Sequence, residues 1–284
     1  MSRIAYVNGR YVPHRSATVH VEDRGYQFAD GVYEVIAVNR GRLVDGEGHF
    51  ARLDRSLAEL RIAPAMSRAS MRVVIDELLR RNGVDEGIVY IQMTRGVAPR
   101  DHAFPKASRT AVVMTARKKR PPSTAALEQG VRVITIPDIR WSRCDIKSVS
   151  LLPNVLGKQR AVEAGAFEAW QVDKDGMVTE GTSTNAWIVT AAGELVTRQP
   201  GEAILNGITR LAVLEIVRAR GLSLLERPFS LAEAKAASEA FITSTTSFVL
   251  PVVRVDDAVI GGGAPGPVSQ ALRARYVEHM SAPA

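Results

Sequence analysis

Several features are scarce or absent in this chain of 284 residues, and each absence excludes a class of protein. Cysteine occurs once, at Cys144, so the chain forms no internal disulfide and is not a disulfide-stabilised scaffold. No apolar run reaches the length of about 18 residues that a transmembrane helix needs, and the first residues lack a signal-peptide pattern. The five histidines are not at metal-ligand spacing, and the GxSxG, HExxH, CxxC and Walker motifs are missing. We therefore expect a cytoplasmic protein without a metal site.

Lysine is also scarce, although the chain is basic. The net charge is +7, and only seven of the 37 basic residues are lysines. The charge leaves a basic nucleic-acid-binding module as an alternative function. However, the basic residues are scattered, and their densest run, at 117–120, is typical of a solvated linker. Few lysines are thus available for any role that requires a primary amine.

The composition, 46% hydrophobic and 24% charged, is that of a globular protein with one large or two smaller domains. The basic run and Pro121-Pro122 indicate a boundary, because proline fixes φ and removes a donor. We expect an α+β domain at 1–117, a linker at 118–123, and a second α+β domain at 124–284 that carries Lys147. Strands are predicted at 4–7, 10–12, 32–38, 88–94, 110–116, 131–136, 144–148, 240–243 and 252–255, with hairpins around 175–176 and 192–193. Helices are predicted around 50–60 and at 70–81, 151–164, 208–220 and 268–279.

Lys147 is the first candidate for chemistry. It lies in the predicted strand 144–148, and a lysine with apolar or small neighbours on a strand loses charge by desolvation. A neutral lysine amine can form a Schiff base. A lysine in a strand is more often an exposed residue, and both interpretations stay open on this segment alone.

Glu180 is the second candidate. A glycine and four small hydrogen-bonding residues follow it, from Thr182 to Asn185, between two strand-like runs. The segment can be an ordinary Ser/Thr-rich turn. Alternatively, the carboxylate keeps a ring nitrogen protonated, as pyridoxal phosphate requires when it acts as an electron sink.

Two further segments offer donors for a phosphate. Asn206-Gly207-Ile208-Thr209 opens a predicted helix, whose N-terminal amides and dipole favour an anion. Residues 243–247 place five hydroxyls in a row after a strand. Each segment alone is also typical of an ordinary helix cap or loop.

Seven segments in order, including these candidates, resemble the class IV aminotransferases, which are pyridoxal-phosphate enzymes of fold type IV. The resemblance is strongest to the D-amino-acid aminotransferase branch and extends across the chain. It implies a two-domain α+β fold, bound pyridoxal 5'-phosphate and a homodimer. The segments are residues 22–28, 30–35, 95–102, 140–148, 179–181, 207–210 and 243–247.

The resemblance also implies roles for individual residues. Lys147 would be the Schiff-base lysine, Glu180 would pair with the pyridine nitrogen, and Leu205 would lie against one face of the ring. A D-amino acid would then displace Lys147 from the cofactor aldehyde, and the freed amine would move the Cα proton. The phosphate would be held by Arg52, Ile208, Thr209 and Thr245, with Ser244 and Thr246 nearby.

The D-amino-acid branch is favoured by Tyr33, Arg100 and His102. In that branch an Arg-x-His pair and a tyrosine bind the α-carboxylate of the substrate, and arginine matches a planar carboxylate best. Two residues apart on an extended loop, Arg100 and His102 would point the same way. Branched-chain L-amino-acid aminotransferases, aminodeoxychorismate lyases and (R)-selective amine transaminases of the same fold remain alternatives. The expected substrates are D-amino acids and 2-oxo acids.

Overall fold

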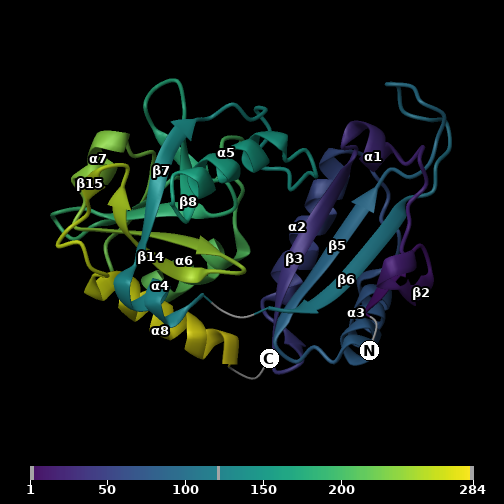
Figure 1. Ribbon diagram of the computed structural model, residues 1–284, viewed down its shortest axis with the longest axis horizontal. Helices are drawn as coiled ribbons and strands as arrows, with labels where there is room; N and C mark the ends of the chain where they lie inside the picture. The colour runs from purple at the N-terminus through teal and green to yellow at the C-terminus, as the bar shows by residue number, and fades with distance from the viewer. Residues whose placement is uncertain (1–2, 120–121, 282–284) are drawn as a thin grey trace. The chain divides into compact units, whose positions relative to one another are not determined.

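The computed structural model of the chain divides into two compact units (Figure 1). It describes residues 3–119 and 122–281. Unit 1 comprises Met1–Arg120 and Ile146–Ser150, and unit 2 comprises Pro121–Asp145 and Leu151–Ala284. The chain therefore passes from unit 1 to unit 2 twice.

Unit 1 is built on a six-stranded antiparallel sheet with the order β2-β1-β6-β5-β3-β4. The turn between the first two strands has positive φ at Asn8 (47°) and Gly9 (95°), which is the type I′ hairpin that this dipeptide predicts. The strands are β1 (Ile4–Val7), β2 (Arg10–Pro13), β3 (Gly31–Asn39), β4 (Arg42–Leu43), β5 (Gly87–Thr94) and β6 (Ala111–Lys118).

Two helices, α2 (Gly46–Glu59) and α3 (Arg68–Asn82), cover one face of this sheet. Phe50, Leu53 and Leu57 recur at helical spacing in α2 and are fully buried against the strands. The N-terminus of α3 is capped by a serine side chain, and Gly83 ends it in the left-handed conformation (φ 59°). A 3₁₀ turn, η1 (His14–Ser16), and a short helix, α1 (Arg24–Phe28), complete the unit.

Unit 2 contains a nine-stranded sheet with the order β12-β11-β10-β13-β14-β7-β8-β9, and β15 pairs with β14. Three pairs are parallel, β7 with β8, β7 with β14 and β11 with β12, and the others are antiparallel. The strands are β7 (Val131–Pro137), β8 (Glu168–Val172), β9 (Val178–Gly181), β10 (Asn185–Val189), β11 (Leu195–Thr197), β12 (Leu224–Glu226), β13 (Glu239–Ser244), β14 (Phe248–Val255) and β15 (Ala258–Val259).

The helices of unit 2 pack at different places along this strand order. Helix α5 connects the parallel strands β7 and β8, and α6 and α8 bury Val213, Val217, Leu272 and Tyr276 against β10 and β13. The helices are α4 (Thr124–Gln129), α5 (Leu152–Glu163), α6 (Ile208–Ala219), α7 (Leu231–Lys235) and α8 (Pro267–Ser281). The expected α+β class is confirmed, because strands and helices are mixed in both units without a regular βαβ alternation.

Two expectations about the segment around Lys147 are wrong. Residues 144–148 form no strand, and only Ser148 makes an isolated bridge, to Val32 of β3. Backbone hydrogen bonds also join Lys147 and Val149 to β3. Ile146–Ser150 belongs to unit 1, whereas the sequence analysis placed Lys147 in the C-terminal domain. Part of the expected linker 118–123, residues 120 and 121, lies outside the described residues.

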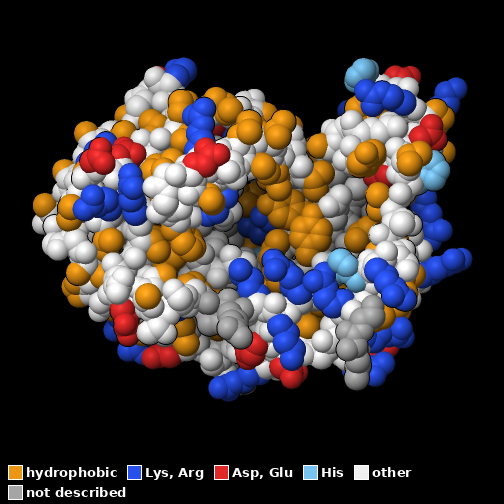
Figure 2. Space-filling view, viewed as in Figure 1, with side chains coloured by type: hydrophobic (Ala, Val, Ile, Leu, Met, Phe, Trp, Pro, Cys, Tyr) orange, Lys and Arg blue, Asp and Glu red, His pale blue; other side chains and the backbone are white. Residues whose placement is uncertain are grey.

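The surface drawn in Figure 2 carries charges of both signs. Lys and Arg side chains lie at many separate places there, among acidic and apolar ones.

Across the ranges 3–119 and 122–281, no helix combines the length and apolarity needed to cross a membrane.

Candidate active site

The backbone of Lys147 is fixed between a strand and a helix of unit 1. Its carbonyl accepts a hydrogen bond from the backbone N–H of Tyr33 (3.0 Å), and its N–H donates to Oγ of Ser56 (3.3 Å). Tyr33 belongs to β3, and Ser56 is a fully buried residue of α2. The segment that carries the amine is therefore held by non-local bonds rather than by a strand of its own.

The amine of Lys147 lies against an aromatic ring. Its Nζ is 4.3 Å from the centroid of the Tyr33 ring, which packs in turn against Tyr90 (5.8 Å between centroids). In the described part of the chain no carboxylate forms an ion pair with this half-buried lysine. An amine without a carboxylate partner suits nucleophilic attack on a carbonyl group.

Arg52, an expected phosphate ligand, is held by a buried carboxylate that the sequence analysis did not single out. Glu34 of β3 is 0% exposed and accepts from Nε and Nη2 of Arg52 (both 2.8 Å) and from Nδ1 of His49 (2.7 Å). Burial alone would raise the pKa of Glu34, but the charge and hydrogen bonds of Arg52 and His49 hold it at about 2. Burial lowers the pKa of His49, against the effect of Glu34. An ionised Glu34 thus orients both side chains of α2.

Arg100 and His102 lie on an exposed loop of unit 1 and contact the same aromatic side chain. The guanidinium of Arg100 is 4.6 Å from the centroid of the Phe28 ring, and the His102 ring is 5.4 Å from it. The buried Arg24 donates to the backbone carbonyls of Asp101 (2.5 Å) and His102 (3.4 Å), which anchors the loop. Within the described residues, no contact joins this pair to Tyr33, so one chain does not bring the expected carboxylate trap together.

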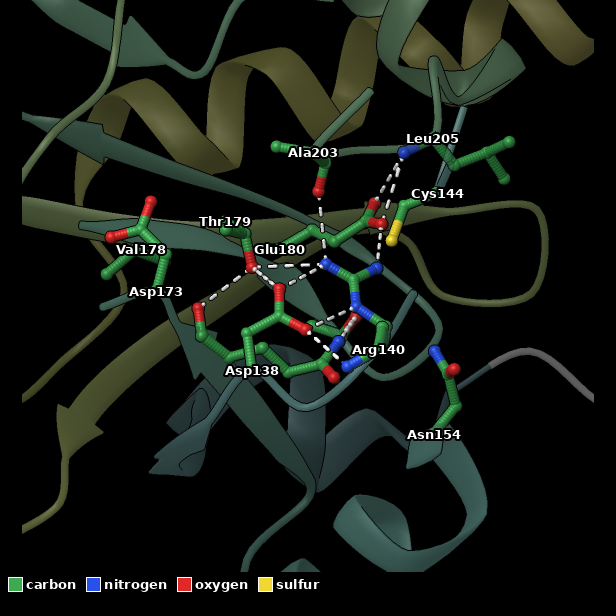
Figure 3. Close-up of polar contacts among 12 residues, drawn as sticks. Asp138, Arg140, Cys144, Asn154, Asp173, Val178, Thr179, Glu180, Ala203 and Leu205 are labelled. Atoms are coloured by element: carbon green, nitrogen blue, oxygen red, sulfur yellow. Dashed lines mark hydrogen bonds and ion pairs between the residues drawn. The ribbon is translucent and has the colours of Figure 1, made fainter. Parts of the chain in front are cut away.

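Glu180 lies in unit 2, at the end of β9, where several donors converge on its carboxylate (Figure 3). The backbone N–H of Leu205 donates to Oε1 and Oε2 (3.1 and 3.2 Å), and Nδ2 of Asn185 donates to Oε2 (3.1 Å). Arg140 donates to Oε1 through Nη1. The residue is 6% exposed, so this is a buried and fully oriented carboxylate rather than a turn residue.

Asp138 holds the other edge of the Arg140 guanidinium. It accepts from Nε (2.9 Å) and Nη2 (2.7 Å), and Thr179 donates to it from Oγ1 (2.8 Å). Burial raises the pKa of Asp138, but the bonds from Arg140 outweigh burial and keep the pKa below its usual range. Burial also raises the pKa of the nearby Cys144 thiol, to about 11, against the opposing charge of Arg140.

The N-terminus of α6 lies next to this carboxylate. Its N-cap residue is Gly207, so no side chain of the N-cap occupies the free N–H groups of the first turn. Ile208 and Thr209 begin the helix. Asn185, which donates to Glu180, also donates to the carbonyl of Leu205 (2.8 Å). A Cβ on Gly207 would lie 2.2 Å from Oδ1 of Asn185, so only glycine permits this close approach.

The predicted hydroxyl segment extends from the neighbouring strand. Thr243 of β13 pairs with Asn185 of β10, and the β13–β14 turn follows it. Ser244 ends β13, and Thr245 and Thr246 lie in the turn; all three are half-buried, and Oγ of Ser244 accepts from the backbone N–H of Ser247 (3.0 Å). Unit 2 therefore brings together Glu180, the α6 N-terminus and the base of the hydroxyl turn.

These residues fit pyridoxal phosphate, which presents an aldehyde, a ring nitrogen and a phosphate. The uncapped N-terminus of α6 and the hydroxyl turn supply donors for an anion. The buried carboxylate of Glu180 suits a protonated nitrogen, and the amine of Lys147 suits an aldehyde.

The comparison with known proteins agrees with this donor set. Residues 31–255 match the family described as amino-transferase class IV, and the chain belongs to this family. The cofactor of this family is pyridoxal phosphate.

Curated relatives are named more specifically. The chain is 43% identical to the D-alanine aminotransferase of Bacillus licheniformis over 263 residues, which cover 93% of this chain and 92% of the relative. It is 39% identical to the D-alanine aminotransferase of Staphylococcus haemolyticus, covering 97% and 98% of the two chains. These alignments span nearly the whole of each protein.

Solved structures establish the fold. The branched-chain amino acid aminotransferase of Escherichia coli superimposes with a TM-score of 0.90 at 23% identity, covering 98% of this chain and 94% of that one. The branched-chain aminotransferase of the archaeon Thermoproteus uzoniensis, solved with norvaline, has a TM-score of 0.85 at 25% identity, covering 99% and 96%. The expected type IV fold is confirmed.

Sequence reasoning gave no individual role to Glu34, His49, Arg140 or Asn185, although the segments that it named contain three of them, Glu34, Arg140 and Asn185. Glu34 lies between Val32 and Ile36 on the buried face of β3, which packs on α2. A charged residue at a position where the alternating pattern calls for an apolar one was the available signal. Arg140 offered no comparable signal, because Glu180 is 40 residues away in the chain.

Proposed function

We propose that this chain catalyses pyridoxal-phosphate-dependent transamination between a D-amino acid and a 2-oxo acid, of the type in which D-alanine and 2-oxoglutarate give pyruvate and D-glutamate. The match to D-alanine aminotransferases at 37–43% identity over at least 93% of the chain carries this proposal. Glu180 and Lys147 supply the chemistry that the reaction needs.

The bound cofactor supplies an electron sink for the carbanion formed at the substrate Cα. Lys147 would hold the cofactor covalently between turnovers and would move the Cα proton during them. Glu180 would keep the ring nitrogen protonated. Leu205 would contact the ring, and Arg52, Ile208, Thr209 and Thr245 would bind the phosphate, with Ser244 and Thr246 nearby.

The substrate α-carboxylate is bound by Tyr33, Arg100 and His102 in a homodimer. Within one chain Arg100 and His102 contact Phe28 and not Tyr33, which supports an arrangement in which the Arg100 loop serves the partner's site. Helix α5 also provides evidence for a homodimer. Three of its apolar side chains, Leu152, Val155 and Leu156, are 68%, 59% and 51% exposed. These three side chains belong to one apolar surface that a partner subunit would cover.

Subunit complementation tests this arrangement. Lys147→Ala is expected to be nearly inactive on D-alanine, and Arg100→Ala to keep about a tenth or less of wild-type activity at D-alanine concentrations below KM. Each homodimer has two defective sites. After subunit exchange at equal amounts, half of the dimers contain one intact site, so we expect about a quarter of the wild-type activity. No recovery in a mixture that has exchanged subunits would place Arg100 in its own subunit's site.

A half-reaction screen tests the function itself. Purified holoenzyme is mixed with single D- and L-amino acids, and the loss of visible cofactor absorbance is followed. We expect D-alanine to react and L-leucine to react much more slowly. Faster reaction of L-leucine and L-isoleucine would favour the branched-chain alternative. The solved branched-chain aminotransferases resemble this chain in fold alone. A location in the cytoplasm stays a prediction of the sequence analysis, based on the single cysteine, the missing signal-peptide pattern and the missing long apolar run.

A further inference from the structure

The guanidinium of Arg140 joins two carboxylates inside unit 2 (Figure 3). Nε and Nη2 form a two-point pair with Asp138, and Nη1 donates to Oε1 of Glu180. The three side chains are only 5%, 12% and 8% exposed, in the order Arg140, Asp138 and Glu180. One planar cation with fixed donors therefore spans the gap between two acceptors.

Further bonds keep the guanidinium from turning. Nη2 of Arg140 also donates to Oγ1 of Thr179 (3.2 Å) and to the carbonyl of Ala203 (3.1 Å). Thr179 immediately precedes Glu180 on β9, so the same arginine contacts both the strand and its functional side chain. A rotation of Arg140 away from Glu180 would break several hydrogen bonds in a buried place.

Two buried carboxylates share the charge of Arg140. Its guanidinium pairs with Asp138 on one side and with Glu180 on the other. Burial lowers the pKa of Arg140, but the two carboxylates outweigh burial and raise it, so the arginine stays charged. A charged arginine in direct contact favours the ionised form of both carboxylates.

We propose that Arg140 is the positioning residue for Glu180: it holds the carboxylate in one orientation and ionised, so that Glu180 accepts the protonated ring nitrogen of the cofactor. This inference rests on the proposed function. In this proposal Arg140 acts through Glu180. Its two partners differ in role, since Asp138 anchors the arginine and Glu180 is the group that it presents.

Other groups also face Glu180. Cys144 lies on the loop after β7, and its thiol is neutral over the ordinary pH range because its pKa is about 11. Arg210 of α6 acts on Glu180 through its charge, but its own hydrogen bonds go to Asn206, Glu226 and the carbonyl of Arg198. Asn185 and the Leu205 amide are uncharged donors. Arg140 is thus a cation that contacts Glu180 directly and can set its charge.

Cofactor affinity across pH tests the proposal. The cofactor-free protein is titrated with pyridoxal phosphate between pH 6 and 9, and binding is followed by visible absorbance. Arg140→Met should weaken binding roughly ten- to a hundredfold, as expected for loss of a charge-assisted hydrogen bond. The loss should grow toward low pH, because a buried Glu180 without its cation takes up a proton more readily.

Arg198→Met is the matched control. Arg198 is also a partly buried arginine of unit 2 paired with an aspartate, Asp173 (2.9 Å), and no described contact joins it to Glu180. It should lower the melting temperature of the cofactor-free protein about as much as Arg140→Met does, yet leave cofactor affinity and its pH profile within about twofold of wild type.

Arg140→Lys serves as a second variant if Arg140→Met does not fold. An ammonium group keeps the charge but lacks the fork that holds both carboxylates, so affinity should fall severalfold. Wild-type affinity and pH profile in the Arg140 variants that fold would overturn the inference while leaving the proposed function intact. A wild-type protein that binds no pyridoxal phosphate and transfers no amino group would instead overturn the proposed function.

Discussion

The amine of Lys147 lies 4.3 Å from the centre of the Tyr33 ring, and the backbones of the same two residues are hydrogen-bonded (3.0 Å). Tyr33 therefore contacts both the backbone and the side-chain amine of the expected Schiff-base lysine. The contact between Lys147 and Tyr33 thus joins the residue expected to bind the cofactor covalently with a residue expected to bind the substrate carboxylate.

Covalent attachment is the first prediction. Borohydride reduction of the holoenzyme followed by peptide mapping should place the pyridoxyl group on Lys147. Lys147→Ala should show no attachment and lose roughly 10²–10⁴-fold in kcat with D-alanine, because the group that moves the Cα proton is gone. Lys158 provides the control, since it lies eleven residues on and bonds to the carbonyl of Phe167. A pyridoxyl group on Lys158 would contradict the assignment.

Glu180→Gln, loaded at saturating cofactor, should lose most of its turnover, since a neutral amide stabilises a pyridinium ion less well than a carboxylate does. The measurement is kcat with D-alanine on a variant whose cofactor content is checked by absorbance. Turnover close to that of wild type in the loaded variant would remove Glu180 from the reaction.

Glu239→Gln offers a matched control for Glu180→Gln. Glu239 is another buried glutamate of unit 2, and its carboxylate accepts from the backbone N–H groups of Val268 and Ser269 (both 2.9 Å) at the start of α8. We expect this variant to lose about 1–2 kcal/mol of unfolding free energy and to keep its turnover.

Arg100→Ala should raise KM for D-alanine and for the 2-oxo acid while leaving the visible cofactor spectrum intact. Loss of a charge-assisted pair corresponds to about ten- to more than a hundredfold in kcat/KM. Amines that lack a carboxylate should be nearly unaffected. Lys106→Ala changes an exposed cation on the same loop and should leave KM unchanged. Equal effects of the two variants would indicate general electrostatic attraction rather than a specific contact.

The stability of unit 1 should depend on the ionisation of Glu34. Its pKa is lowered to about 2 in the folded chain from an ordinary value of 4.5, so folding favours the carboxylate. The stabilisation is complete above pH 4.5 and is lost as the pH falls toward 2, on the order of 3 kcal/mol in all. Denaturant unfolding of wild type and Glu34→Gln between pH 5 and 2.5 should show a shallower pH dependence in the variant.

Glu77 makes the comparison sharp. Its pKa is also about 2, because Arg80 and Arg81 hydrogen-bond to it, but it lies on the exposed side of α3. Solvent and salt screen such pairs, so Glu77→Gln should hardly change the pH dependence of stability. A similar change in both variants would mean that burial of Glu34 adds nothing.

Cys144 should be a slow nucleophile. Burial raises the pKa of its thiol to about 11, and the thiol donates to the carbonyl of Trp141 (3.1 Å). At pH 8 we expect iodoacetamide to react roughly 200-fold more slowly than with an ordinary cysteine, since only the thiolate reacts. The rate should rise about tenfold per pH unit, and denatured protein should react at the ordinary rate. A fast reaction of the native thiol would exclude this environment.

Local sequence signals were sufficient for most of the secondary structure. The Asn8-Gly9 turn, the apolar spacing in α2 and the glycine after α3 each depend on neighbours in the chain, and each matches the structure within a few residues. The strand predicted at 144–148 is wrong for the opposite reason. The backbone of Lys147 bonds to Tyr33 and to Ser56, and no local pattern encodes partners so far away.

The sequence by itself determined the α+β class, the aminotransferase family and the residue types available for its chemistry, because motif spacing and periodicity are properties of the chain. Only the tertiary structure decided that Lys147 belongs with unit 1, that Glu34 holds Arg52 and that Arg140 holds Glu180. These pairs form because folding buries charges that must then find partners, and the nearest partner in space is distant in the sequence.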